Sequence, residues 1–167
     1  HADALSVTLS VDGVPVLVDS GTYIYHIESR WRDYFRRTAQ HNTVTVDGAD
    51  QSEMKGAFLW GRKAKTTLLE PPAGSLPDRV RAMHDGYAER GILHHRTIEW
   101  LDFDTLRIED SLTAERNEPH DYQLGFVVAA GARVFLADGV TAVVEADGPV
   151  ETATGHQGRT GGVRVRL

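Results

Sequence analysis

Apolar and polar residues alternate along most of this chain, and a period of two is the pattern of β-strands with one buried face. In residues 5–11 and again in residues 14–18, a leucine or valine occupies every second position. Asp12-Gly13 separates the two runs, and an Asp-Gly pair in this setting favours the tight turn of a β-hairpin. The first 18 residues therefore predict a hairpin of two antiparallel strands.

Further strand-like runs follow at 43–46, 57–69, 79–84, 92–100, 105–110, 122–129, 133–136, 140–145 and 163–167. Many short strands separated by turn signals predict an all-β fold, an antiparallel β-sandwich with two layers. Residues 27–38 lack the period of two, and we expect one short helix or ordered loop there. No internal repeat or domain boundary is visible, so residues 1–167 are expected to form a single domain.

The composition narrows the function classes. A length of 167 residues with 41% hydrophobic and 25% charged residues is ordinary for one globular domain. The net charge of -6 argues against a nucleic-acid-binding protein, and no apolar run reaches the roughly 20 residues of a membrane span. The absence of cysteine excludes disulfides, thiolate ligands and a cysteine nucleophile. No signal-peptide pattern is visible, and we expect the chain, which opens at His1, to be a fragment of a longer polypeptide.

Three residues near the start have the chemistry of metal ligands. His1, Asp19 and His41 each lie in or beside a strand-like run, and sheet pairing could bring them together. Imidazole and carboxylate groups bind zinc and similar divalent ions. Their spacing alone does not separate a metal site from three unrelated polar residues at strand ends.

Residues 30–37, which lie between Asp19 and His41, are rich in arginine and aromatic residues. These arginines suit a carboxylate or sulfate, because the planar guanidinium binds such groups through two parallel hydrogen bonds. We therefore expect an anionic sugar as ligand, although a solvated loop with internal ion pairs to Glu28 and Asp33 is the simpler interpretation of any single arginine. The predicted substrate-binding arginines are Arg30, Arg32, Arg36 and Arg37.

Two tyrosines and one further histidine complete the candidates. The hydroxyl of Tyr34 could act as an acid or base if nearby cations lower its pKa. Tyr25 is a candidate sugar contact, with a core or interface aromatic as the alternative. His84 could line a cleft or simply belong to a turn. The sequence contains no nucleophile elbow of the G-x-S-x-G type and no phosphate-binding loop.

The motifs around these residues occur in a recognisable order. The chain has an H-x-D opening, then D-x-G-T-Y and HNTV-x-V-D-G segments, and later HDGYAERGILHHRTIEW and LRIEDSL. Over residues 1 to about 130 it resembles the C-terminal β-domain of the heparinase II/III-like polysaccharide lyases. That family includes lyases acting on heparin or heparan sulfate and on alginate.

The resemblance implies an architecture and a metal site. The family β-domain is an antiparallel sandwich packed on an N-terminal helical toroid, with substrate in the cleft between them. We therefore expect the helical domain of the same polypeptide, absent from this chain, as a partner. The family β-domain often binds zinc through two histidines and an aspartate, which here would be His1, Asp19 and His41. A periplasmic or secreted location is expected for the family.

The resemblance also implies a reaction, β-elimination at a uronic acid residue of an acidic polysaccharide. A base removes the C5 proton, the carboxylate is neutralised, and the C4 oxygen leaves after gaining a proton. The toroid normally supplies an Asn, a His and a Tyr. This chain would contribute the metal, a neutralising arginine and, as catalytic candidates, Tyr34 and His1. The isolated chain should therefore be inactive or nearly so.

Two other functions remain open. A non-catalytic carbohydrate-binding sandwich would use the same arginines and tyrosines without chemistry. Alternatively, His1 as a mature N-terminus could hold copper with a second histidine and a tyrosine, as in monooxygenase-type braces, and copper is the ion that such a site binds most strongly. The brace would leave Asp19 without a role.

Overall fold

The structure is a computed structural model, and it describes residues 1–23, 29–74, 78–102, 105–136, 141–145 and 162–166. The strands are β1 (Leu9–Val11), β2 (Val14–Leu17), β3 (Val44–Val46), β4 (Thr66–Glu70), β5 (Asp78–His84), β6 (Ile92–Trp100), β7 (Leu106–Ala114), β8 (Tyr122–Leu124), β9 (Arg133–Leu136), β10 (Thr141–Glu145) and β11 (Gly162–Arg166). One α-helix, α1 (Ser29–Arg36), and two short 3₁₀ turns, η1 (Thr38–Gln40) and η2 (Ala88–Arg90), complete the elements in this part of the chain.

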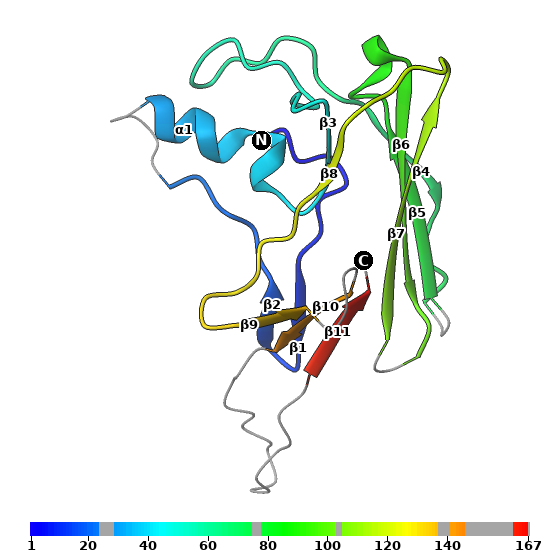
Figure 1. The fold of residues 1–167 in the computed structure, drawn as a ribbon. Coiled ribbons are helices and arrows are strands. Elements are labelled where there is room, and N and C mark those ends of the chain that lie inside the picture. Colours follow the sequence, from blue (N-terminus) through cyan, green and yellow to red (C-terminus); the bar gives the residue numbers. More distant parts are fainter. Residues whose placement is uncertain (24–28, 75–77, 103–104, 137–140, 146–161, 167) are drawn as a thin grey trace, which may run out of the picture.

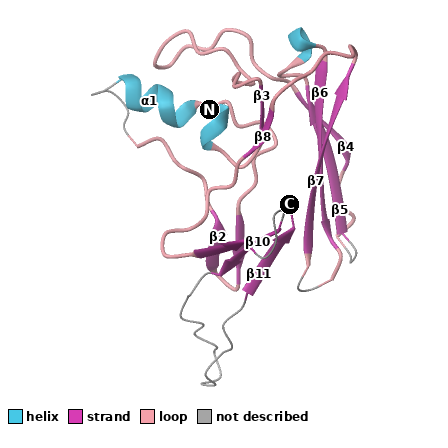
Figure 2. Cartoon of the chain, in the orientation of Figure 1, coloured by secondary structure: helices cyan, strands magenta, loops and turns pink. Residues whose placement is uncertain are grey.

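The strands form four antiparallel groups. The largest is a sheet in the order β4-β5-β6-β7, which stands on one side of the molecule in Figure 1. The pairs β1-β2 and β3-β8 and the sheet β11-β10-β9 lie on the other side (Figure 2). An apolar cavity of about 250 Å³ is lined from both sides, by Leu17 at the end of β2 and by Ile98 and Ile108 on β6 and β7. The prediction of an antiparallel β-sandwich is confirmed.

The first hairpin forms at the predicted turn. Val11 pairs with Val14, and the two residues between them have positive φ, 50° at Asp12 and 79° at Gly13. Two consecutive positive φ values are those of the turn whose twist matches antiparallel strands, and Asp-Gly tolerates them well. The same pair recurs at Asp47 (52°) and Gly48 (65°), where the chain turns back directly after β3.

The buried core centres on β3, which is covered on both faces. Val44 and Val46 pack with Tyr87 and Ile92, and all four side chains are at most 2% exposed. The Tyr87 hydroxyl donates to the Val44 carbonyl at 2.8 Å, so this buried polar group is satisfied. The strand that begins three residues after His41 is therefore fixed in the interior.

Residues 27–38 were predicted to form a short helix or an ordered loop, and the structure has helix α1 there. Its residues Arg32 and Arg36 are one helical turn apart and both are buried. Residues 24–28, which include the candidate Tyr25, lie outside the described residues. None of the described helices is long and apolar enough to cross a membrane.

Three predicted strands are shorter than expected. In the first, predicted from the alternation in residues 5–11, only Leu9–Val11 is strand. Residues 57–65 form a loop, and β4 begins only at Thr66. In this loop the chain folds on itself, with an isolated bridge between Met54 and Trp60 and a hydrogen bond from the Glu53 N–H to the Arg62 carbonyl. Residues 57–60 therefore do not extend a sheet, and Phe58 and Leu59 among them are exposed. Similarly, only Tyr122–Leu124 of the predicted run at 122–129 is strand β8.

Candidate functional site

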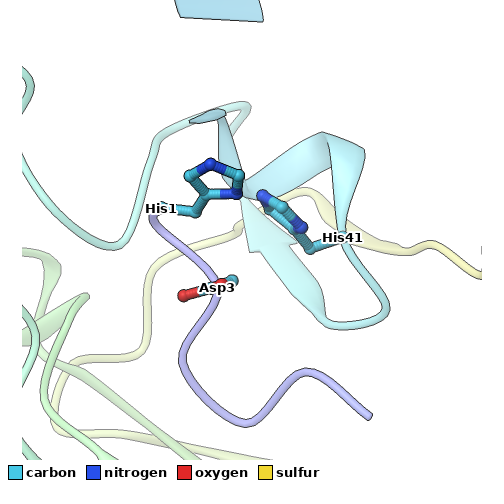
Figure 3. A group of neighbouring side chains, drawn as sticks. All are labelled: His1, Asp3 and His41. Carbon is cyan, nitrogen blue, oxygen red and sulfur yellow. The ribbon is translucent and has the colours of Figure 1, made fainter. Parts of the chain in front are cut away.

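The structure places His1, the first residue, next to His41. His1, Asp3 and His41 each offer a ligand atom, and these atoms all lie within 4.8 Å of one another. The imidazole rings of His1 and His41 are 5.0 Å apart between centroids (Figure 3). His1 is exposed, Asp3 is partly buried and His41 is 1% exposed, so the group lies at the surface with one ligand from the interior. We call His1, Asp3 and His41 the metal group.

His41 has one ring nitrogen engaged and one without a partner. Nδ1 lies 2.8 Å from Oδ2 of Asp19. Nε2 is buried and has no hydrogen-bond partner among the described residues. A buried polar atom without a partner is costly, and a bound ion is one ordinary way in which proteins satisfy such an atom. The atom left over for a ligand is therefore Nε2.

Asp19 lies behind His41 rather than within the metal group. Its Oδ1 accepts from the Gly21 N–H at 2.8 Å, while Oδ2 faces the His41 ring. Gly21 has a φ of 71°, which suits the turn that this carboxylate closes. Asp3 takes the carboxylate position beside both histidines. Asp3 was not among the predicted ligands, although the H-x-D opening contains it.

The segment that carries His1 and Asp3 is held by the end of the helical stretch. Ala2 is 1% exposed, its N–H donates to the Arg36 carbonyl at 2.9 Å, and its carbonyl accepts from the Thr38 hydroxyl at 2.7 Å. The Thr22 hydroxyl lies 3.3 Å from Nε2 of His1. The residues that lead from α1 to His41 therefore also position the first ligand candidate.

The four candidate arginines divide into two buried and two exposed residues. Nε of Arg32 donates to the Ala57 carbonyl at 2.7 Å, and an NH of Arg36 donates to the Gly56 carbonyl at 2.9 Å. Their guanidinium groups also lie over aromatic rings of the same loop, 4.4 Å from Phe58 and 4.3 Å from Trp60. Burial and the nearby Arg32 lower the pKa of Arg36 from its ordinary value. Arg32 and Arg36 therefore hold the 56–60 loop against α1.

Arg30 and Arg37 are exposed. The Arg30 guanidinium lies 5.5 Å from the centre of the Trp31 ring, and Arg37 pairs with Asp50 at 3.4 Å. These two side chains are the members of the predicted set that can reach a ligand from solvent.

Tyr34 is 44% exposed and belongs to an aromatic cluster on α1. Its ring lies edge-on to Trp31 and Phe35, at 5.8 Å and 5.3 Å. The Tyr23 ring stacks on the Phe35 ring, with 5.4 Å between centroids, and the residue is 72% exposed. The backbone of Tyr23 has a positive φ of 58°. Because Tyr23 directly follows Thr22, the aromatic cluster adjoins the metal group.

His84 lies in the interior rather than on a substrate-facing surface. It is 0% exposed, its Nδ1 accepts from the Gly86 N–H at 3.0 Å, and its Nε2 is 2.9 Å from Nδ1 of His94. Burial, with a smaller effect of His94, lowers the pKa of His84 to about 3. His94 in turn contacts Asp110 at 2.7 Å. The neighbours of His84 in sequence suggested a cleft, but the β5-β6-β7 sheet encloses this side chain.

Comparison with known proteins bears on the family and the fold of this chain. The family model described as "Heparinase II/III-like, C-terminal" matches residues 1–166. A solved structure titled as a heparinase III gene product with methylated lysines is similar, with a TM-score of 0.66 and 20% sequence identity. The match covers 86% of this chain and 20% of that chain, and at this identity the likeness shows the fold alone. The comparison with curated proteins gives no match. Because the family match spans almost every residue, this chain belongs to the heparinase II/III-like family and corresponds to its C-terminal domain.

Proposed function

We propose that this chain is the β-domain part of a polysaccharide lyase that cleaves uronic-acid-containing acidic glycans by β-elimination. The observation that carries the proposal is the family match over residues 1–166. Arg30 and Arg37 are exposed, and they support an acidic substrate because guanidinium groups pair well with carboxylates and sulfates. The second part of the proposal is a zinc site in this domain.

Zinc fits the donor set of the metal group. Two imidazoles, a carboxylate and an open position form a common zinc arrangement. His1, Asp3 and Nε2 of His41 would hold the ion, and the unpartnered state of that buried atom supports this assignment. Asp19 would accept a hydrogen bond from Nδ1 of His41, as carboxylates often do behind a zinc-bound histidine. When bound, zinc supplies a fixed positive charge beside the sugar-binding surface.

The sequence resemblance and the geometry favour different residues as the carboxylate ligand of the proposed zinc ion. The resemblance suggests Asp19 as the direct ligand, which would require the ion at Nδ1 of His41. The geometry supports Asp3, because Nδ1 already faces Asp19 at 2.8 Å while Nε2 has no partner among the described residues.

In the proposed reaction the C5–H bond of a uronate breaks and its electron pair forms a double bond to C4. The bond between C4 and its oxygen breaks, the departing oxygen takes up a proton, and no water is consumed. The sugar carboxylate must be neutralised for the C5 proton to leave, and Arg30 or Arg37 would pair with it. Tyr34 and His1, both exposed, are our candidates for moving a proton at the site.

The helical domain expected from the resemblance would supply the other catalytic groups. We therefore propose that this chain works next to that domain in a longer polypeptide, in the periplasm or outside the cell. The solved structure that it resembles is a much longer chain, of which this one covers 20%.

The test uses the full-length polypeptide with a panel of sulfated glycosaminoglycans, alginate and other uronate polymers. The expected result is a rise in ultraviolet absorbance from unsaturated uronate on at least one polymer, with zinc in the purified protein. His41→Ala should lower zinc content and rate together, whereas Arg30→Ala should weaken substrate binding with zinc retained. No absorbance rise on any acidic polymer would refute the lyase proposal. Binding without cleavage would support the non-catalytic sandwich, and copper in place of zinc would support the brace.

A further inference from the structure

Asn42, the residue directly after His41, makes hydrogen bonds with every polar group that it has. It is 0% exposed. Its backbone N–H donates to the Ser6 hydroxyl at 3.1 Å, and its backbone carbonyl accepts from a guanidinium NH of Arg96. Its side-chain amide adds three more bonds, to three different segments. No part of this residue is left for water or ligand, so its role must be exercised through its neighbours.

The side-chain bonds reach the segments that carry the candidate ligands. Nδ2 donates to the Val7 carbonyl at 2.6 Å and to the Val18 carbonyl at 2.9 Å, and Oδ1 accepts from the Val127 N–H. Val7 belongs to the N-terminal segment of His1 and Asp3, and Val18 directly precedes Asp19. Asn42 itself directly follows His41. Its side-chain amide therefore connects the backbone segments that carry His1 and Asp3, Asp19, and His41.

The chemistry of these bonds selects asparagine. Two carbonyls need two N–H donors, and the Val127 N–H needs one acceptor, so only one orientation of the amide satisfies all three. Aspartate has the same shape but would set a carboxylate oxygen against two carbonyls. Serine could satisfy only part of the set. The requirement is therefore for this side chain and not for a polar residue in general.

The same residue is tied to the large sheet. Arg96 on β6 donates to the carbonyls of both Asn42 and Leu5, and Asp110 on β7 holds its guanidinium through two bonds of 2.7 Å and 2.8 Å. The N-terminal segment and the loop after His41 are thus fixed to β6 and β7 through one buried ion pair.

We propose that Asn42 is the positioning residue of the metal group: it holds the segments of His1 and Asp3, of Asp19 and of His41 in the register that lets them share one ion. The proposal rests on the zinc site proposed above. Residues that orient metal ligands without touching the ion typically change affinity by about 10- to 100-fold when they are replaced.

The test compares zinc affinity and a metal-free signal in Asn42→Ser, Ser6→Ala and Tyr87→Phe. Tyr87→Phe is the control, because it removes a buried hydrogen bond to the Val44 carbonyl, three residues after His41, but no bond to the segments that carry His1, Asp3 and Asp19. Affinity is measured by competition with a chromophoric chelator, on protein shown to be folded by circular dichroism. The metal-free signal is the His41 Nδ1–H resonance, which reports the hydrogen bond to Asp19.

We expect Asn42→Ser to bind zinc at least about 10-fold more weakly and to lose the His41 resonance, while Tyr87→Phe stays within about two-fold of the unchanged chain. Ser6→Ala loosens only the N-terminal segment, so it should lower affinity by about three-fold and keep the resonance. If Asn42→Ser does not fold, the zinc affinity of Ser6→Ala tests the positioning role of Asn42.

Folded Asn42→Ser with unchanged affinity and an unchanged resonance would overturn the proposal, as would an equal loss in Tyr87→Phe. An unchanged affinity in Ser6→Ala would overturn it if Asn42→Ser does not fold. If the unchanged chain binds no zinc, the zinc site proposed above fails instead. The His41 resonance in the metal-free variants then still decides whether Asn42 positions the pair of His41 and Asp19.

Discussion

Replacing Asp19 by asparagine tests how the two carboxylates share the proposed metal centre. Asp19 lies 2.8 Å from Nδ1 of His41, whereas the buried Nε2 of the same ring has no partner among the described residues. Asp19→Asn keeps the size of the side chain and an acceptor for the Gly21 N–H but removes the charge behind His41. Asp3→Asn instead weakens a direct ligand. We therefore expect both variants to bind zinc more weakly, and Asp3→Asn to be the weaker of the two.

The size of the effect follows from the position of Asp19 behind the ligand. Loss of such a carboxylate costs about 10- to 100-fold in metal affinity, or roughly 1.4 to 2.7 kcal/mol. Zinc at 100 times its dissociation constant should stabilise the unchanged chain by about 2.7 kcal/mol. At the same zinc concentration, a site weakened about 30-fold should gain only about 0.9 kcal/mol.

The assay is urea unfolding with and without zinc, combined with chelator competition for the affinity itself. Asp12→Asn is the control, because Asp12 lies in the exposed first turn, at a positive φ that asparagine tolerates. The reasoning would be refuted if Asp3→Asn kept full affinity while Asp19→Asn lost it. That result would put the ion on Nδ1 of His41, with Asp19 as its direct ligand.

Three further predictions concern the fold. Because burial lowers the pKa of His84 to about 3 from 6.5, the unfolded chain takes up a proton there first as the pH falls. Stability contributed by neutral His84 is therefore full above pH 6.5 and is lost between that pH and about 3, with roughly 2 kcal/mol lost by pH 5. Urea unfolding at pH 7.5 and pH 5 should show this loss in the unchanged chain and a smaller loss in His84→Gln; equal losses would contradict the assignment. Arg36→Ala should cost about 2–4 kcal/mol in urea unfolding, because it removes a buried hydrogen bond to the Gly56 carbonyl and the packing on Trp60. Arg30→Ala, on the same helix but exposed, should stay within about 0.5 kcal/mol, and an equal cost would show that burial is not the cause. Gly86→Ala should destabilise by about 1–3 kcal/mol in the same assay, because its Cβ would lie 2.9 Å from the Gln51 backbone carbonyl; a neutral effect would mean that the two backbones can separate.

Local signals in the sequence were sufficient for the elements that depend on near neighbours. Asp12-Gly13 predicts the first turn because the required positive φ values are a property of those two residues. Alternation predicts β5, β6 and β7 because the two faces of a strand differ along the chain itself. The change of period at 27–38 located α1, and the residue types selected His1 and His41, which the structure brings together.

Burial and partners were decided only by the tertiary structure. Arg30 and Arg36 have the same side chain on the same short helix, yet the 56–60 loop covers Arg36 and leaves Arg30 exposed. His84 is the last residue of β5, a strand with the same alternation as its neighbours, but its enclosure depends on residues of β6 and β7. The choice between Asp3 and Asp19 beside His41 has the same origin. A sequence pattern states what a residue can bind, whereas the segments that fold against it determine which groups are close enough to bind.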